Sequence, residues 1–242
     1  MLKRRIIPVL LLKDGRMVKG KKFKDFRDTG NPRTAVKIYN SQYADELMFI
    51  DIDATLQSRK ALIDILSNAA KESLMPLSVG GGIRNIEDAR QILATGADKV
   101  LITSEAFQNH SFIKEAVKRF GSQAIILGID YKFNLVTKKN EVWTHCGTKP
   151  TTVDPIKLIE IYKSLDVGEI MLNSIDRDGM MGGYDIELGK WASKILDIPL
   201  IMCGGAGNFQ HIEEIFKNTQ ASAAACSSVF HFGDNCPMQA RT

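Results

Sequence analysis

Two glycine clusters are each followed, at the same distance, by a pair of small hydroxyl residues. The clusters are Gly80-Gly81-Gly82 and Gly204-Gly205-Ala206-Gly207, and the hydroxyl pairs are Thr103-Ser104 and Ser227-Ser228. Backbone N–H groups can crowd around a phosphate only where no Cβ intervenes, and glycine provides that access. The repeat therefore predicts two phosphate cradles and a phosphorylated small-molecule ligand with a phosphate at each end, whereas each glycine cluster taken singly is typical of a tight turn.

The elements that would position these cradles alternate along the chain. Short apolar runs with β-branched residues predict strands over 5–12, 46–52, 76–79, 99–103, 124–130, 169–174, 199–203 and 223–226. Segments of helical period lie between them, over 32–43, 59–71, 86–93, 111–120, 155–165, 186–196 and 211–217. Eight such units predict a (β/α)8 TIM barrel, with a doubly wound open sheet as the alternative. We expect one domain over 1–242, built from duplicated half-barrels over about 1–122 and 123–242, with a stunted eighth helix.

Composition narrows the classes of function. The 242 residues are 44% hydrophobic and 25% charged, and the formal net charge is +4, well below the clustered basicity of a nucleic-acid-binding protein. The four cysteines and four histidines lack the spacing of a metal site, so we expect no metal and no cofactor. No apolar run approaches a membrane span, and no secretory signal precedes the chain, so we expect a cytoplasmic protein without nucleic-acid or membrane partners.

Catalytic groups of a barrel lie at the carboxyl ends of its strands. Asp130 closes the fifth predicted strand, so we expect it at this end of the barrel. The basic segment 13–22, which contains Lys19 and Gly20, follows the first strand, and we expect a mobile loop that closes over an anion as a substrate lid. An ordinary solvated loop is the alternative. Residues 133–145 are typical of a hairpin inserted after the fifth strand.

A set of motifs covers nearly the whole chain. They are Arg5-Ile6-Ile7-Pro8, Lys13-Asp14-Gly15-Arg16, Gly80-Gly81-Gly82-Ile83-Arg84, Phe120-Gly121-Ser122-Gln123, Ser174-Ile175-Asp176-Arg177-Asp178-Gly179 and Val229-Phe230-His231-Phe232. Together they resemble the cyclase subunit of imidazole glycerol phosphate synthase. The resemblance implies a barrel that takes ammonia from a glutaminase partner and closes an imidazole ring on a substrate with two phosphates. It also implies phosphate contacts at these residues: Gly82, Thr103, Ser104, Asp178, Gly179, Gly205 and Ser228.

The sequence departs from that family at one catalytic position. The family places aspartates at the ends of strands one and five as a general acid–base pair, and this chain keeps Asp130 but has Leu11 at the other position. Losing such a group typically costs about 10²–10⁴ in rate. The chain also resembles the paralogues found with surface-polysaccharide genes, which implies ammonia delivery for amidination of a sugar and a sugar amidotransferase as a further partner. We favour this interpretation over a working histidine-pathway cyclase, and over a regulatory barrel without chemistry.

Four charged residues open strands at the other end of the predicted barrel. Arg5, Glu46, Lys99 and Glu169 start strands one, two, four and six, so two cations and two anions are expected in one layer. Charges that enter a core are costly unless they are paired. These positions match the gate at which the resembling family admits ammonia, so we expect a glutaminase subunit to dock on this strand N-terminal face, near Asp45 and Asp98. Four unconnected rim charges are the alternative.

Overall fold

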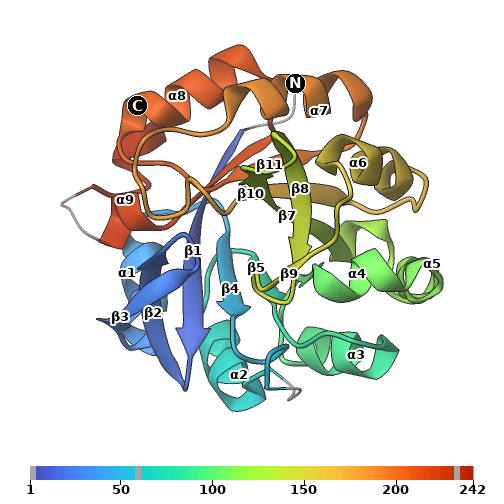
Figure 1. The fold of residues 1–242 in the computed structure, drawn as a ribbon. Coiled ribbons are helices and arrows are strands. Elements are labelled where there is room, and N and C mark those ends of the chain that lie inside the picture. Colours follow the sequence, from blue (N-terminus) through green and yellow to red (C-terminus); the bar gives the residue numbers. More distant parts are fainter. Residues whose placement is uncertain (1–3, 58–60, 232–234, 242) are drawn as a thin grey trace.

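The computed structural model describes residues 4–57, 61–231 and 235–241. Its centre is a closed barrel of eight parallel strands (Figure 1), in the order β1 (Arg5–Lys13), β4 (Leu47–Asp51), β5 (Leu77–Gly80), β6 (Lys99–Ile102), β7 (Ile125–Asn134), β10 (Glu169–Ser174), β11 (Leu200–Cys203) and β12 (Ala223–Cys226). Closure is complete because β1 pairs with both β4 and β12, while β7 pairs with both β6 and β10. The predicted barrel is confirmed, and an open doubly wound sheet is excluded.

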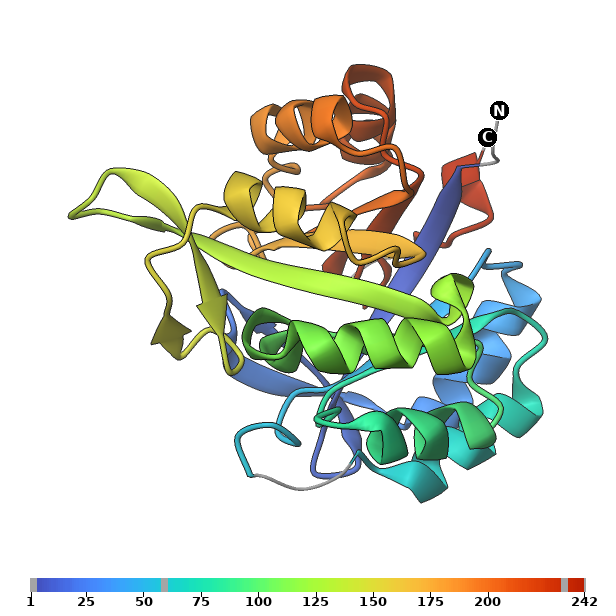
Figure 2. The ribbon, with the colours of Figure 1, turned by 90° about the vertical axis from the view of Figure 1, so that its right-hand side faces the viewer.

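Helices cover the outside of the barrel (Figures 1 and 2). They are α1 (Pro32–Ser41), α2 (Ile63–Glu72), α3 (Ile86–Ala94), α4 (Ser104–Gln108), α5 (His110–Phe120), α6 (Pro155–Lys163), α7 (Ile186–Ile195), α8 (Phe209–Asn218) and α9 (Ser228–His231), with 3-10 turns at Ser122–Ala124 and Gln239–Arg241. Local sequence fixes several starts: the Asn85 side chain accepts from Asp88 N at 3.0 Å and so caps α3. The predicted start of the second helix at residues 59–60 lies outside the described residues. After the last strand, α9 has only four residues.

The core has two layers because successive side chains of a strand face opposite ways. Along β1, Ile7, Val9 and Leu11 point into the barrel and join an inner cluster, whereas Leu10 and Leu12 pack against the helices. The inner cluster also contains residues from the other strands: Met48, Leu101, Ile126, Met171, Ile201, Ala223 and Ala225. The barrel interior is therefore apolar between its two ends, and Leu11 is its uppermost layer on β1.

The segment expected as a mobile loop after the first strand is instead a strand pair, β2 (Arg16–Lys21) and β3 (Lys24–Gly30). β2 runs antiparallel to β1 through a two-residue turn at Asp14 and Gly15, whose φ values are 48° and 78°. Asp-Gly is a strong signal for such a hairpin, and our sequence analysis missed it. Within β2, Met17, Val18, Lys19 and Gly20 are all buried. The role of Lys19 and Gly20 as a substrate lid stays a prediction.

A second antiparallel extension follows β7. There β8 (Lys139–Thr144) pairs with β7, and β9 (Lys149–Pro150) pairs with β8, as expected for the inserted hairpin. Figure 2 shows this yellow-green hairpin projecting beyond the barrel, on the side away from the chain's N-terminus. Two residues of the β8–β9 turn, Cys146 and Thr148, line the cavity described below. Among the described residues, no helix is long and apolar enough to cross a membrane.

Candidate functional site

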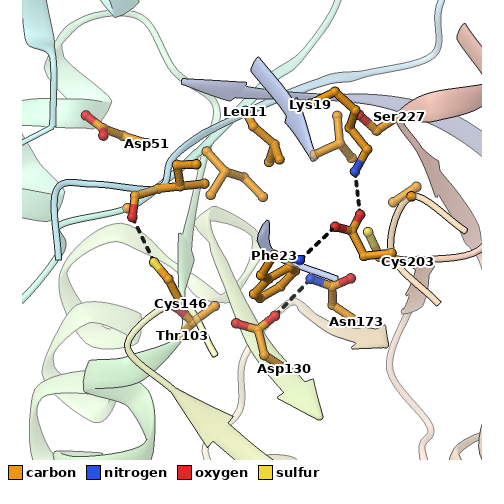
Figure 3. Close-up of a pocket in the computed structure, with 18 of the residues that line it drawn as sticks. Leu11, Lys19, Phe23, Asp51, Thr103, Asp130, Cys146, Asn173, Cys203 and Ser227 are labelled. Carbon is orange, nitrogen blue, oxygen red and sulfur yellow. Dashed lines mark hydrogen bonds and ion pairs between the residues drawn. The ribbon is translucent and has the colours of Figure 1, made fainter. Parts of the chain in front are cut away.

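A cavity opens at the carboxyl ends of the barrel strands (Figure 3). It brings together most of the residues that the sequence predicted for the site: Leu11, Lys19, Thr103, Ser104, Asp130, Asp178, Gly179, Gly205 and Ser228. Gly82 lines an adjoining recess that shares Thr103 and Ser104 with this cavity. Gly20 does not line either space. We refer to the cavity as the mouth.

Asp130 is one of the carboxylates that line the mouth. Its Oδ1 accepts a hydrogen bond of 2.9 Å from Asn173 Nδ2, which comes from the neighbouring strand β10 (Figure 3). Burial raises the pKa of Asp130 to about 6, with a further contribution from the charge of Asp178, and the hydrogen bond from Asn173 opposes the rise. A carboxyl group with this pKa exists in both protonation states near neutral pH, which suits proton transfer.

Leu11 faces the same cavity from β1. Its side chain belongs to the inner apolar cluster, and the residue is 9% exposed. In Figure 3 it reaches the mouth from a different side than Asp130. This wall of the mouth therefore presents a hydrocarbon surface at the position where the resembling family has an aspartate.

Lys19 is not a solvent-exposed lid residue. It is 3% exposed and forms an ion pair with Asp178, in the turn after β10. The backbones also meet here, because a Cβ on Gly179 would lie 2.2 Å from the carbonyl oxygen of Gly20. Gly179 has φ +71°, a conformation that favours glycine. These contacts hold the β2–β3 ribbon against the turn after β10. Because the Asp178 carboxylate is paired with Lys19, only the backbone of Asp178 is suited to bind a phosphate.

The first predicted cradle lies between the turn after β5 and the start of α4. Gly82 has φ +68°, and its N–H donates to Thr55 Oγ1 at 3.3 Å. Ser104 Oγ accepts from His145 N at 2.8 Å, so the β8–β9 turn reaches this recess. Arg84 also lines it and adds a positive charge. The recess thus combines backbone N–H groups, hydroxyls and a cation, which are groups that bind phosphate.

The second predicted cradle lies after β11 and β12. Gly205 has φ +118°, and a Cβ there would lie 2.1 Å from the carbonyl oxygen of Gly183, so only glycine fits. Ser228 is buried, and Ser227 Oγ is a buried atom without a hydrogen-bond partner in the described structure. Both hydroxyl residues line the mouth with Gly204 and Gly205. A buried hydroxyl that lines a cavity and has no hydrogen-bond partner is suited to an oxygen-rich ligand.

At the opposite end of the barrel, the four charged residues at the strand starts form one ring. Arg5 contacts Glu46 at 2.7 Å and Glu169 at 2.5 Å, and Lys99 contacts the same two carboxylates at 2.9 and 2.6 Å. Ser78 Oγ also donates to Glu46 at 2.5 Å. Asp45 and Asp98, nearby, accept from the backbone N–H groups of Ile6 and Leu77. The four charges are therefore paired with one another across the barrel axis.

Two further mouth residues were missed by our sequence analysis. Cys146 comes from the β8–β9 turn, and its thiol donates to the carbonyl oxygen of Ile52 at 2.8 Å (Figure 3). Asp53 lies two residues beyond the end of β4 and is 7% exposed. No motif marked either residue. The alternation Asp51-Ile52-Asp53 at a strand end was the available signal for Asp53, since alternate residues of an extended chain face the same way.

Comparison with known proteins agrees with this architecture. The model of the family described as "Histidine biosynthesis protein" matches residues 5–235. The chain is 41% identical to the imidazole glycerol phosphate synthase subunit HisF of Methanococcus vannielii, over 96% of this chain and 92% of that protein. It is 44% identical to the subunit of the same name from Pyrococcus furiosus, over 97% of this chain and 92% of that protein.

Proposed function

The chain belongs to the histidine biosynthesis protein family, and from this premise we propose that it is the barrel subunit of an imidazole glycerol phosphate synthase-type complex. In this proposal a glutaminase partner docks at the strand N-terminal face and releases ammonia there. The ammonia enters through the ring of Arg5, Glu46, Lys99 and Glu169 and travels along the apolar barrel interior. It then reacts at the mouth with a ligand that carries two phosphates.

The observation that supports this proposal is the pairing within the charged ring. The ring closes the end of the barrel with two cations, Arg5 and Lys99, and two glutamates, and all four are costly to desolvate. Apolar side chains could close the same end without that cost, so the charges need another explanation. A paired ring remains polar enough to pass a small neutral base while excluding bulk water. The inner cluster above it offers ammonia no ionisable group before Asp130. One end is thus suited to admit ammonia and the other to use it.

At the mouth, Asp130 is the group suited to proton transfer. As a carboxylic acid it can protonate an oxygen or nitrogen of the ligand, and as a carboxylate it can accept a proton from the attacking ammonia. We propose that Gly82, Thr103 and Ser104 bind one phosphate, and that Gly179, Gly205, Ser228 and the backbone of Asp178 bind the other. Lys19 holds the ribbon with Gly20 in place over the ligand.

We also propose that the barrel consists of duplicated half-barrels over about 1–122 and 123–242. The antiparallel extensions support this, because one follows β1 and the other follows β7, the first and fifth strands of the barrel. The helix caps support it too. Asn85 and Asn208 follow the two glycine clusters, have nearly identical backbone angles, and each accept a hydrogen bond from the third residue of the helix they cap. Each half then contributes one phosphate cradle.

A second candidate function is delivery of ammonia to a sugar amidotransferase that acts on surface polysaccharide, which our sequence analysis ranked first. Leu11 favours it, since the mouth lacks the aspartate of the resembling family at that position. The similar proteins favour the synthase, because both carry the name of that enzyme's subunit. We therefore place the histidine-pathway cyclase first and reverse the earlier order.

Ring closure with the bis-phosphorylated aminoimidazole precursor tests the proposal directly. The purified chain is assayed with ammonium salts and, in a second assay, with glutamine and a glutaminase subunit of the same synthase family. We expect turnover with both nitrogen sources, and formation of a stable complex between the two chains. Absence of ring closure with both nitrogen sources would contradict the synthase. The second candidate would be supported if the complex instead supplied ammonia to a sugar amidotransferase that modifies its sugar substrate.

A further inference from the structure

One carboxylate of the mouth has no role in the account above. Asp53 lines the cavity just beyond β4, and its side chain is only 10% exposed. Its Oδ1 lies 3.8 Å from Lys13 Nζ, at the outer limit of an ion pair. Its Oδ2 is buried and has no hydrogen-bond partner in the described part of the chain. The neighbouring Asp51 differs, because its Oδ1 accepts from Ala54 N at 3.2 Å and so closes a turn.

An unsatisfied carboxylate oxygen in this position needs an explanation. Leaving a buried acceptor without a donor typically costs about 1–3 kcal/mol, and more when the group is charged. Lys13 relieves this cost only in part, because its ammonium is also 5.6 Å from the Phe26 ring and its side chain is 40% exposed. A donor supplied by a ligand in the mouth would satisfy the remaining oxygen.

The position of Asp53 relates it to the missing aspartate. β1 and β4 are neighbours in the barrel, with Leu11 opposite Ile50, and Ile52 N continues the ladder to Leu12 O at 3.0 Å. Asp53 therefore follows the end of β4, the strand beside β1, which carries Leu11. It lines the same cavity as Asp130 and Cys146. Burial raises the pKa of the Cys146 thiol to about 12, and the charges of Asp130, Asp53 and Asp51 add to the rise.

We propose that Asp53 is the second proton-transferring carboxylate of the mouth, acting with Asp130 in place of an aspartate at position 11. This inference rests on the proposed function and names a further catalytic residue for it. The titratable groups that share the mouth with Asp53 include Lys13 at the end of β1, Cys146 in the β8–β9 turn, Asp130 on β7 and its own neighbour Asp51. Burial raises the pKa of Asp130, so Asp130 is the acid of the pair and Asp53 the base.

The proton balance of ammonia addition is then complete. The nitrogen lone pair forms a bond to a carbonyl carbon of the ligand, and the π electrons of the carbonyl move to its oxygen, which takes the proton of Asp130. Asp53 takes a proton from the nitrogen. When the hydroxyl leaves as water it takes that proton back from Asp53, and Asp130 recovers one from the nitrogen. An imine and one water result, and both carboxyl groups return to their starting states.

The test compares Asp53→Asn, Asp53→Glu and the double variant Leu11→Asp with Asp53→Asn, using ammonia-dependent ring closure by the full chain. Asp197→Asn serves as the control, because Asp197 is an exposed partner of Lys163 far from the mouth. We expect Asp53→Asn to lower kcat by about 10²–10⁴ with little change in KM, and to remove the acid limb of the kcat–pH profile. We expect Asp53→Glu to keep part of the activity and the acid limb of the kcat–pH profile. The double variant, with Leu11→Asp added to Asp53→Asn, should have a kcat at least about tenfold above that of Asp53→Asn alone.

Each outcome separates this inference from the proposed function. If the unaltered chain turns over and Asp53→Asn matches it in kcat and pH profile, Asp53 is not catalytic and the inference alone fails. A lower kcat with an unchanged pH profile and no rescue by Leu11→Asp would assign Asp53 a structural role and also overturn it. If the unaltered chain does not close the ring with either nitrogen source, the proposed function fails and this inference fails with it.

Discussion

The two ends of the barrel differ in how their polar groups are satisfied. In the ring at the strand N-terminal end, each of the four side chains contacts both residues of opposite charge. At the mouth, three buried polar atoms have no hydrogen-bond partner among the described residues: Asp53 Oδ2, Asn173 Oδ1 and Ser227 Oγ. Closed pairs stabilise the protein itself, whereas unsatisfied atoms are available to a ligand. The contrast is what we expect if the mouth binds the ligand and the ring admits ammonia, as proposed above.

The ends also differ in the direction of their pKa shifts. Burial works against the charge of Glu169, but hydrogen bonds and charges from Arg5 and Lys99 outweigh it and lower its pKa. Burial dominates at Asp130 and raises its pKa to about 6. The ring therefore favours the ionised form of Glu169, and the mouth favours the protonated form of Asp130. The differences in hydrogen bonding and in pKa direction between the two ends can each be tested by mutation.

The largest expected effect is on catalysis at the mouth. Asp130→Asn removes the carboxyl group and keeps the size of the side chain, so we expect kcat for ring closure to fall by about 10²–10⁴. The limb of the kcat–pH profile near pH 6 should disappear with it, since Asp130 titrates there. Asp197→Asn is the matched control. A variant that keeps the rate and the limb near pH 6 would show that the mouth does not use Asp130.

The next effect is on stability at the ring. Glu169→Gln leaves Arg5 and Lys99 with one carboxylate between them, and we expect the free energy of unfolding to fall by about 3 kcal/mol. Because the pKa of Glu169 is lowered on folding, its stabilisation is present above the ordinary glutamate pKa and is lost as pH falls through the lowered value. The unaltered chain should thus lose stability below about pH 4.5, and the variant should show a shallower loss.

Urea unfolding between pH 3 and pH 8 measures the free energy of unfolding of each variant and how it depends on pH. The exposed pair of Lys163 and Asp197, 3.2 Å apart, is the control, and Asp197→Asn should change the free energy of unfolding by less than about 1 kcal/mol. Equal effects of Glu169→Gln and Asp197→Asn would mean that the ring is no more than a set of surface charges.

Stability at the mouth should respond in the opposite direction. The raised pKa of Asp130 means that the folded protein binds this proton more tightly, so stability falls as pH rises from about 4 to 6 and stays lower above that range. We expect Asp130→Asn to raise the free energy of unfolding at pH 7 by about 1–3 kcal/mol, with no gain at pH 3. A variant that is less stable than the parent at neutral pH would contradict the assignment of a strained carboxylate to the mouth.

The smallest effect concerns the cradles. Calorimetric titration of the unaltered chain with inorganic phosphate should show two sites. Gly205→Ala forces a Cβ to 2.1 Å from the Gly183 carbonyl oxygen, so the C-terminal site should be lost while the site near Gly82 and Ser104 remains. Gly182→Ala is the control, because nothing lies within 4 Å of a Cβ there. Two unchanged sites in Gly205→Ala would show that the glycine serves only the turn.

The sequence predicted the barrel strands because each buried strand carries a nearly continuous apolar run between helical segments. The charged ring could also be predicted, since Arg5, Glu46, Lys99 and Glu169 start strands and parallel strands bring their starts together. The β2–β3 ribbon was missed although Asp14-Gly15 signals a hairpin, because the basic composition suggested a solvated loop. The alternation Asp51-Ile52-Asp53 could have placed Asp53 at the mouth. Its oxygen without a hydrogen-bond partner among the described residues could not be predicted, since partners depend on tertiary contacts.

The central claim is that ammonia passes from the ring to the mouth, and Lys99→Met tests it most directly. Glutamine-dependent and ammonia-dependent ring closure are measured on the same complex of barrel and glutaminase. Methionine removes one cation and opens the ring, so the account predicts that glutamine-dependent turnover falls by at least about tenfold while ammonia-dependent turnover stays within about twofold. Equal loss with both nitrogen sources, or no loss with glutamine while the complex stays intact, would contradict passage through the ring.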